Sequence, residues 1–253
     1  MKCSEIMNRL TEMMPLELQE EWDNSGFQAG RLSKNVKSIC VCLDLTSEAA
    51  DAAIAANADL IVTHHPLIFH PLKQVSEERI LKILEKGISV ISMHTNYDRA
   101  KGCMADLAAE RMQLKSRKPF TDGFGKTGKL PRKMTVDQIA DAVKKAFDLP
   151  YVQVFNGDKI TAKEDKIIIM PGGGHSMVRD FIASECKIMI SSDFSHDNYM
   201  DTRECGKCLI DAGHYGIEKI FIDDICRKLL GLCGSKVKVS PVYEVNTGPG
   251  YYR

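Results

Sequence analysis

Asp59-Leu60-Ile61-Val62-Thr63-His64-His65-Pro66 is the stretch from which the fold of this chain can be predicted. Leu60 to Thr63 are apolar or β-branched, which predicts a short buried strand, and Pro66 cannot continue a strand ladder. The strand therefore runs out into two adjacent imidazoles, His64 and His65. Imidazole nitrogens bind most first-row divalent metals, so this strand end is a candidate metal site.

The segments around this strand repeat the same arrangement. Strands are predicted over 36–45 and 88–94, and helices over 47–57, 76–87 and 102–112. This alternation predicts a parallel sheet with helices on its faces. In such sheets the chemistry collects at the carboxyl ends of the strands. The polar residues that the sequence places at those ends are Asp44, His64, His65, His94 and Asp98.

A second half is predicted beyond residues 113–134, whose Lys, Arg, Gly and Pro content breaks the pattern and indicates a domain junction. Thr135-Val136-Asp137-Gln138 is a capping box that opens the next helix. Further helices alternate with strands to the end of the chain. The prediction is an α/β fold of two related three-layer α/β/α halves with mainly parallel sheets. The first half covers 1–125 and is completed by about 210–253, and the second covers 126–209.

A second histidine segment, Asp211-Ala212-Gly213-His214-Tyr215-Gly216-Ile217-Glu218, lies near the end of the chain. It puts a His and a Glu four residues apart at the start of a helix, where they share one face. Together with the earlier His and Asp residues, these side chains suit two metals bridged by a carboxylate at about 3.5–4 Å. The alternative is that His64-His65 is a polar loop and that His214 caps a helix.

Composition narrows the function classes. The 253 residues are 44% hydrophobic and 27% charged, which is typical of a globular protein with a real core. Lys+Arg and Asp+Glu are both 34, so nothing favours nucleic acid or an anionic membrane. No apolar run reaches the roughly 18 residues of a membrane span. Nine cysteines without a signal peptide predict free thiols in the cytoplasm.

Each of two smaller motifs has two possible interpretations. Gly172-Gly173-Gly174 is either a tight turn or an anion cradle, because glycines expose backbone N–H groups. Cys205 and Cys208 form either a redox or zinc pair or two buried thiols. A P-loop-like run at 123–130 is rejected, because Leu130 stands where the hydroxyl that binds magnesium should be.

Five blocks, in the same order along nearly the whole chain, resemble those of the Nif-three-like family of dinuclear metal-centre hexameric proteins, the type 2 homologues of GTP cyclohydrolase I. The blocks are Trp22 to Gln28, Leu43 to Thr46, Thr63 to Pro66, His94 to Asp98 and Gly213 to Glu218. One block departs from the family, since Ser191-Ser192-Asp193 stands where the family usually has Thr-Gly-Glu. The role of that loop is therefore open.

The resemblance implies a metal site between the two halves, holding two divalent ions per chain (zinc, iron or manganese). The implied ligands are His64, His65, Asp98, His214 and Glu218, and the supporting candidates are His94, His196 and Asp44. It further implies a toroidal homohexamer. The expected function is a metal-dependent hydrolase of a small molecule, with GTP or another nucleotide as the candidate substrate and no nucleic acid or membrane partner. The alternative is a non-catalytic metal-binding, interaction or regulatory protein.

Overall fold

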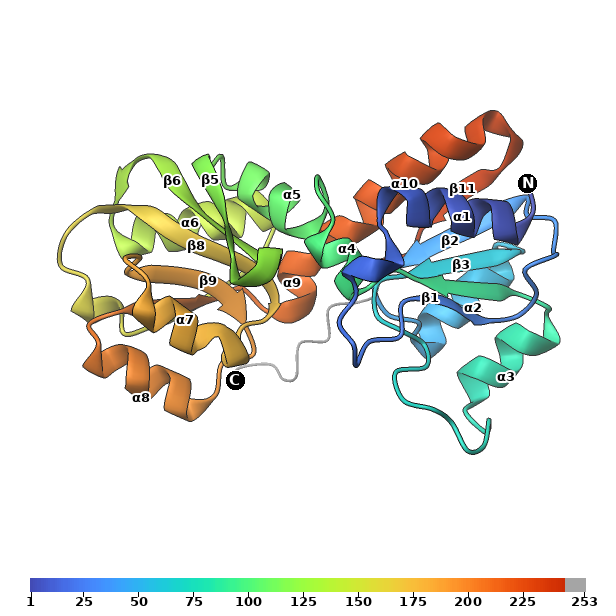
Figure 1. Ribbon diagram of the computed structural model, residues 1–253, viewed down its shortest axis with the longest axis horizontal. Helices are drawn as coiled ribbons and strands as arrows, with labels where there is room; N and C mark the ends of the chain where they lie inside the picture. Colours follow the sequence, from blue (N-terminus) through green and yellow to red (C-terminus); the bar gives the residue numbers. More distant parts are fainter. Residues whose placement is uncertain (244–253) are drawn as a thin grey trace. The chain divides into compact units, whose positions relative to one another are not determined.

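The computed structural model describes residues 1–243 and confirms the predicted α/β class (Figure 1). The chain forms two compact units, each with its own sheet. Among the described residues, the first contains Met1–Lys101 and 221–243, and the second contains Gly102–Ile220. Residues 244–253 of the predicted first half lie outside the described residues.

The boundaries of the units differ from the predicted positions 125/126 and 209/210. The helix α5, Met104–Arg111, packs on strands of the second sheet, so the second unit begins at Gly102. Residues 113–134 form no junction, because they contain two antiparallel strands, β5 (Lys115–Phe120) and β6 (Gly125–Met134). The polar residues there face solvent, and this conceals the strands from an analysis of hydrophobic pattern.

The first sheet has the strand order β1-β4-β3-β2-β11. Its strands are β1 (Gly26–Ala29), β4 (Ser89–Ser92), β3 (Leu60–Thr63), β2 (Ser38–Cys42) and β11 (Lys238–Pro241). β4, β3, β2 and β11 are parallel, and β1 joins β4 in the antiparallel direction. Every residue of β2, β3 and β4 is buried, as expected for parallel strands covered on both faces.

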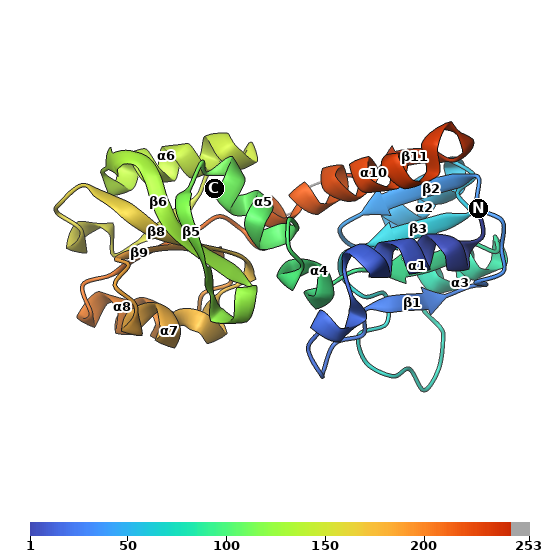
Figure 2. The same ribbon diagram turned by 45° about the horizontal axis from the view of Figure 1, so that its top comes forward.

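Helices cover both faces of this sheet (Figures 1 and 2). One face carries α1 (Cys3–Met13) and α10 (Ile220–Cys233), and the other carries α2 (Ser47–Ala55) and α3 (Glu78–Glu85). The layer under α2 and α3 is a continuous apolar core that includes Cys40, Ala50, Ile61 and Ile83. The short helix α4, Thr95–Arg99, follows β4 directly.

The second sheet is mixed, with the order β5-β6-β8-β9-β10-β7. The remaining strands are β7 (Gln153–Phe155), β8 (Glu164–Gly173), β9 (Ile188–Ser192) and β10 (Cys208–Asp211). Among the described strands of this sheet, β8 pairs with β9 and β9 with β10 in parallel, and the other neighbouring pairs are antiparallel. α5 and α6 lie on one face, and α7 and α8 on the other (Figures 1 and 2). The helices are α6 (Val136–Phe147), α7 (Val178–Ala183), α8 (His196–Glu204) and α9 (His214–Glu218).

No helix among residues 1–243 is both long enough and apolar enough to cross a membrane.

The capping box predicted at Thr135 is present. The Thr135 hydroxyl accepts a hydrogen bond from the backbone N–H of Gln138, and the side-chain oxygen of Gln138 accepts one from the backbone N–H of Thr135.

One buried cation fastens the second unit. Lys207 is 8% exposed, and its ammonium donates to the carbonyls of Phe181, Ser184 and Cys186 at 2.8, 2.7 and 2.8 Å. These carbonyls lie at and beyond the carboxyl end of α7, where a positive charge is favourable. The ammonium also lies 4.8 Å from the centre of the Phe181 ring. Lys207 therefore ties α7 and the loop after it to the start of β10.

We predict that Lys207→Met lowers the free energy of unfolding by about 2–3 kcal/mol, because a similar buried volume remains while three carbonyls lose a charged donor. Urea unfolding followed by circular dichroism measures this. Lys187→Met is the matched control, because the Lys187 side chain is 54% exposed and forms a surface ion pair with Glu164. The control should change stability by about 0.5 kcal/mol or less. Equal effects of the two substitutions would contradict the role given to Lys207.

Candidate metal centre

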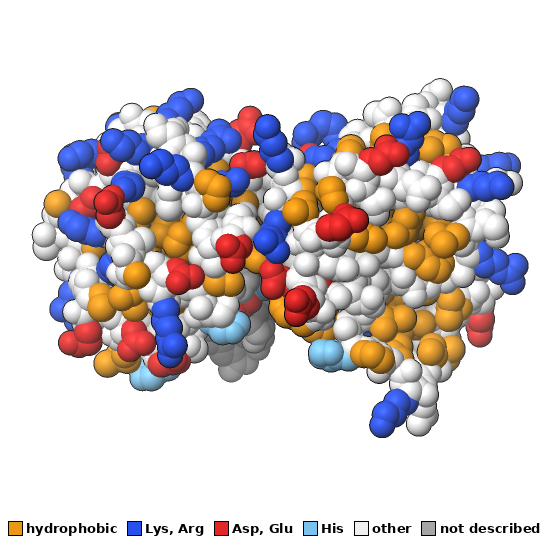
Figure 3. All heavy atoms as spheres, viewed as in Figure 1, with side chains coloured by type: hydrophobic (Ala, Val, Ile, Leu, Met, Phe, Trp, Pro, Cys, Tyr) orange, Lys and Arg blue, Asp and Glu red, His pale blue; other side chains and the backbone are white. Residues whose placement is uncertain are grey.

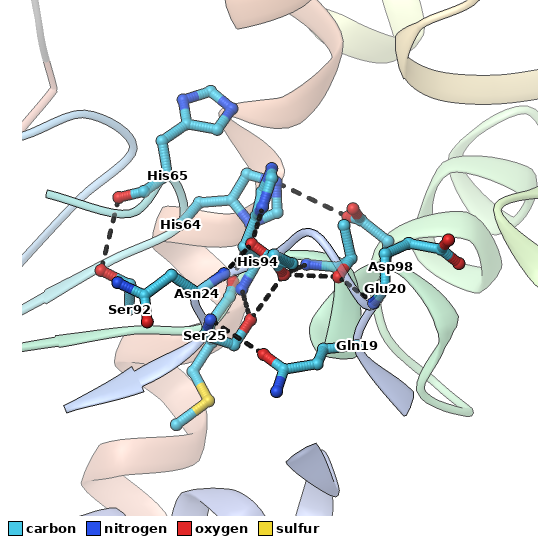
Figure 4. Close-up of polar contacts among 12 residues, drawn as sticks. Gln19, Glu20, Asn24, Ser25, His64, His65, Ser92, His94 and Asp98 are labelled. Atoms are coloured by element: carbon cyan, nitrogen blue, oxygen red, sulfur yellow. Dashed lines mark hydrogen bonds and ion pairs between the residues drawn. The ribbon is translucent and has the colours of Figure 1, made fainter. Parts of the chain in front are cut away.

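Four polar side chains of the first unit gather because three strands end together. β2, β3 and β4 are parallel, and Cys42, Thr63 and Ser92 lie side by side at their carboxyl ends. The residues that follow these positions therefore leave the same edge of the sheet. This edge carries the predicted residues Asp44, His64, His65 and His94, and Asp98 follows one turn later on α4. Figure 4 shows the three histidines and Asp98.

His64 is fully buried and held on both sides. Its Nδ1 lies 2.8 Å from the carbonyl oxygen of Met93, and its Nε2 lies 3.5 Å from Oδ1 of Asp98. The rings of Tyr97 and Phe221 pack against the imidazole, with centroid distances of 5.9 and 5.1 Å. Because a carbonyl oxygen only accepts, Nδ1 must donate, which leaves the lone pair of a neutral imidazole on Nε2.

His65 and His94 are oriented in the same way by carboxylates. His65 Nδ1 lies 2.7 Å from Oδ1 of Asp44, and His94 Nδ1 lies 2.7 Å from Oδ1 of Asp23. One ring nitrogen from each of His64, His65 and His94 can be chosen so that all three lie within 4.8 Å of one another. These groups could hold a metal ion.

Asp23 is a buried partner of His94 that the sequence analysis did not single out within the Trp22 to Gln28 block. Its side chain is fully buried and accepts hydrogen bonds from His94, Ser25 and both the backbone and hydroxyl of Thr95. Burial opposes ionisation of Asp23, but these bonds and the charge of His94 outweigh it and lower the pKa of the carboxyl. The antiparallel pairing of Gly26 with Ser92 carries Asp23 to His94.

A second cluster lies in the second unit, around α9. His214 Nδ1 lies 2.5 Å from Oδ2 of Asp193, and His214 Nε2 lies 3.0 Å from Oε2 of Glu218. Burial opposes protonation of His214, but the adjacent Glu218 carboxylate and the bond to Asp193 raise its pKa. The hydrogen bond from His214 lowers the pKa of Asp193. Asp193 thus supports His214, although its sequence block departs from the family.

The glycine turn beside this cluster accommodates a carboxylate. A Cβ on Gly172 would lie 2.7 Å from Oε1 of Glu218, so the close approach requires glycine. Gly172 also has a φ of +78°, and its carbonyl accepts from the hydroxyls of Ser191 and Ser192. A negatively charged neighbour makes Gly172 unsuited to cradle an anion, and its role is to admit Glu218.

The other predicted candidates lie apart from these bonds. His196 is exposed at the first residue of α8. Cys208 is buried in β10, where burial raises its pKa to about 12, whereas Cys205 is exposed. A metal ligand or redox nucleophile must be a thiolate, so the environment of Cys208 favours a buried thiol.

The donor set fits divalent metals. All four histidines of the two clusters have Nδ1 bonded to an oxygen, and the acceptors belong to Met93, Asp44, Asp23 and Asp193. Such partners fix the ring orientation and the tautomer that presents Nε2 to a metal. Asp98 and Glu218 add carboxylates next to His64 and His214.

Fold and side chains together define an α/β protein with His and carboxylate clusters at the strand ends. The Duf34/NIF3 (NGG1p interacting factor 3) family profile matches residues 1–249. This chain belongs to that family.

Individual relatives agree with this assignment. A Helicobacter pylori protein named GTP cyclohydrolase 1 type 2 is 35% identical over 229 residues, covering 86% of each chain. A Clostridium acetobutylicum protein named GTP cyclohydrolase 1 type 2 homolog is 28% identical over 244 residues, 91% of this chain and 90% of the relative. The crystal structure of a Bacillus cereus protein related to NIF3 has the same fold, with a TM-score of 0.91 and 21% sequence identity. The match covers 100% of this chain and 99% of the Bacillus cereus chain.

We predict that Asp23→Asn lowers the free energy of unfolding by about 2–3 kcal/mol at pH 7, because an amide nitrogen replaces one of two buried oxygens that accept several hydrogen bonds. The lowered pKa of Asp23 adds a pH dependence. Its ionised form stabilises the fold fully above about pH 4 and progressively less as the pH falls below that value. The variant should therefore lose less stability than the native protein between about pH 4 and pH 2.

Urea unfolding across this pH range measures both effects. Asp51→Asn is the control, because the Asp51 side chain is 61% exposed and pairs with Lys82 at the surface. An Asp23→Asn variant as stable as this control, with an unchanged pH profile, would show that the buried network contributes nothing.

Proposed function

We propose that this chain binds two divalent metal ions (zinc, iron or manganese) and is a metal-dependent hydrolase of a small molecule. The observation that carries the proposal is the hydrogen bond at Nδ1 of each histidine, which leaves Nε2 as the ligand atom. The proposed ligands are His64, His65, Asp98, His214 and Glu218.

Each residue has a separate task in this proposal. Asp44 and Asp193 hold His65 and His214 in place through 2.7 and 2.5 Å bonds. Asp98 and Glu218 provide anionic oxygens that offset the charge of the ions. Bound divalent ions would supply Lewis-acid polarisation of the substrate and activation of water for attack. His94, anchored by Asp23, stands beside His64 and His65 as a further imidazole that can accept or donate a proton.

The candidate substrate is taken from the relatives. Proteins that share 28–35% identity with this chain carry the name GTP cyclohydrolase 1 type 2 or its homologue. GTP is therefore the first substrate to test, followed by other nucleotides and phosphoesters, since fold and metal centre do not define a substrate. A homohexamer in the cytoplasm is the assembly and location that we propose with this activity.

We predict about two metal ions per chain in the native protein and clear losses in Asp98→Asn and Glu218→Gln, because each substitution removes an anionic ligand. Elemental analysis after dialysis measures this. Asp51→Asn is the control: it removes an exposed carboxylate that is not among the proposed ligands, and it should retain the native metal content. Native protein that remains empty after zinc, manganese or iron is added would overturn the metal proposal.

Turnover is tested on the same proteins. The metal-loaded native chain should release product from GTP, another nucleotide or a phosphoester, and the two metal-poor variants should be at least about 100-fold slower. Full metal content without turnover on all three substrate classes would overturn the hydrolase assignment. It would favour the alternative of a metal-binding interaction protein.

We also predict that Asp193→Asn weakens metal affinity about 10- to 100-fold, because His214 loses a charged partner at Nδ1. Asparagine tolerates the φ of +55° at this position, so the loop itself should remain. Isothermal titration with zinc measures the affinity. Asp197→Asn, an exposed change four residues along the chain, is the control. Equal affinities of the two variants would contradict the role assigned to Asp193.

A further inference from the structure

Two aromatic rings stand exposed next to the histidine cluster of the first unit. Trp22 is 56% exposed and Phe69 is 40% exposed, and their ring centroids lie 5.7 Å apart with planes tilted by 44°. Both rings form T-shaped pairs with the His94 imidazole, with centroid distances of 6.1 Å from Trp22 and 6.2 Å from Phe69. Figure 3 shows hydrophobic side chains gathered on the drawn face of the first unit, over β1 and the loops beside it. Large exposed aromatic surfaces are costly unless something covers them.

The two rings are held in position by a polar clamp. They come from different loops, one before β1 and one after β3. Asn24 donates to the carbonyl of Ile68 at 2.5 Å, and the backbone N–H of Ile68 donates to Gln28 at 3.2 Å. Gln28 donates in turn to the carbonyl of Asn24 at 2.5 Å. The carbonyl of Ile68, the residue before Phe69, is thus bonded to the loop that carries Trp22, and its N–H is bonded to the adjoining strand β1, so the aromatic pair is preorganised.

The position of the pair indicates what covers it. His94 separates the exposed rings from His64 and His65, with ring distances of 5.2 and 5.6 Å. A ligand lying on Trp22 and Phe69 would therefore extend over His94 toward the proposed metal ligands. A flat ring gains most from such a surface, because aromatic faces stack on π systems of any base.

We propose that Trp22 and Phe69 form a stacking ledge for a planar heteroaromatic ring, such as a nucleobase, whose polar substituents reach the histidine cluster. This deepens the proposed function and rests on it for the place where reaction occurs. The stacking itself is measurable without turnover.

The protein offers its own probe, because Trp22 is the single tryptophan in the chain. GTP and guanosine should quench Trp22 fluorescence saturably, whereas ribose 5-phosphate and inorganic triphosphate should not. N-acetyltryptophanamide under the same conditions corrects for absorption by the purine. Quenching that is no greater than in this amide control, or equal quenching by ribose 5-phosphate, would overturn the ledge.

A matched pair of variants tests the second ring. Phe69→Leu keeps an apolar side chain but removes the π face, and it should raise the Kd of guanosine about tenfold. Tyr151→Leu removes a comparably exposed ring (51%) from the second unit and should leave the Kd unchanged. Circular dichroism confirms that both variants fold. Equal Kd values for Phe69→Leu and the native protein would overturn the proposal.

The outcomes separate this inference from the proposed hydrolase. Ring-dependent quenching with the Phe69→Leu effect but no turnover would keep the ledge and remove the hydrolase. Turnover that neither quenches Trp22 nor responds to Phe69→Leu would keep the hydrolase and remove the ledge. A ligand-free blue shift of Trp22 emission that follows protein concentration and oligomer size would assign this surface to a second copy of the chain and overturn the ledge.

Discussion

The hydrogen bond between His64 Nδ1 and the Met93 carbonyl is the interaction on which the arrangement of the candidate metal ligands in the first unit depends. His64 is fully buried, and a buried imidazole without partners would cost several kilocalories per mole. The bond satisfies one nitrogen and sets the tautomer, so that the other nitrogen carries the lone pair. Because the acceptor is a backbone carbonyl at the end of the neighbouring strand, the orientation of the His64 ring is fixed by the sheet itself. A change in strand register would remove it.

Parallel pairing provides this constraint, and the antiparallel edge strand extends it. β2, β3 and β4 bring Asp44, His65 and His94 to one edge of the sheet. β1 runs the other way and returns the loop before it to the same edge, where Asp23 reaches His94 and Ser25 donates through its hydroxyl to Asp23. The loop that supports His94 also carries Trp22. The orientation of His94 and the placement of Trp22 therefore depend on the same short strand.

Sequence analysis could predict what is local and missed what is distant. The runs of buried residues in β2, β3 and β4 identified the strands and the polar residues at their ends. The contact between Asp23 and His94 could not be predicted, because the two residues lie 71 positions apart and the Gly26–Ser92 register leaves no local sequence pattern. β5 was missed because all but the last of its residues are exposed and charged or polar residues dominate it. Asp193 was visible only as a departure from a family block.

The two clusters hold their histidines with different electrostatic surroundings. In the first unit a carbonyl holds His64, and its carboxylate neighbour Asp98 lies 3.5 Å away. In the second unit His214 lies between two carboxylates, which raise its pKa and favour its protonated form. A divalent cation at Nε2 would have to displace that proton, so its binding must be linked to proton release. The metal affinity at His214 should therefore increase more steeply with pH than the metal affinity of a site built from neutral imidazoles alone.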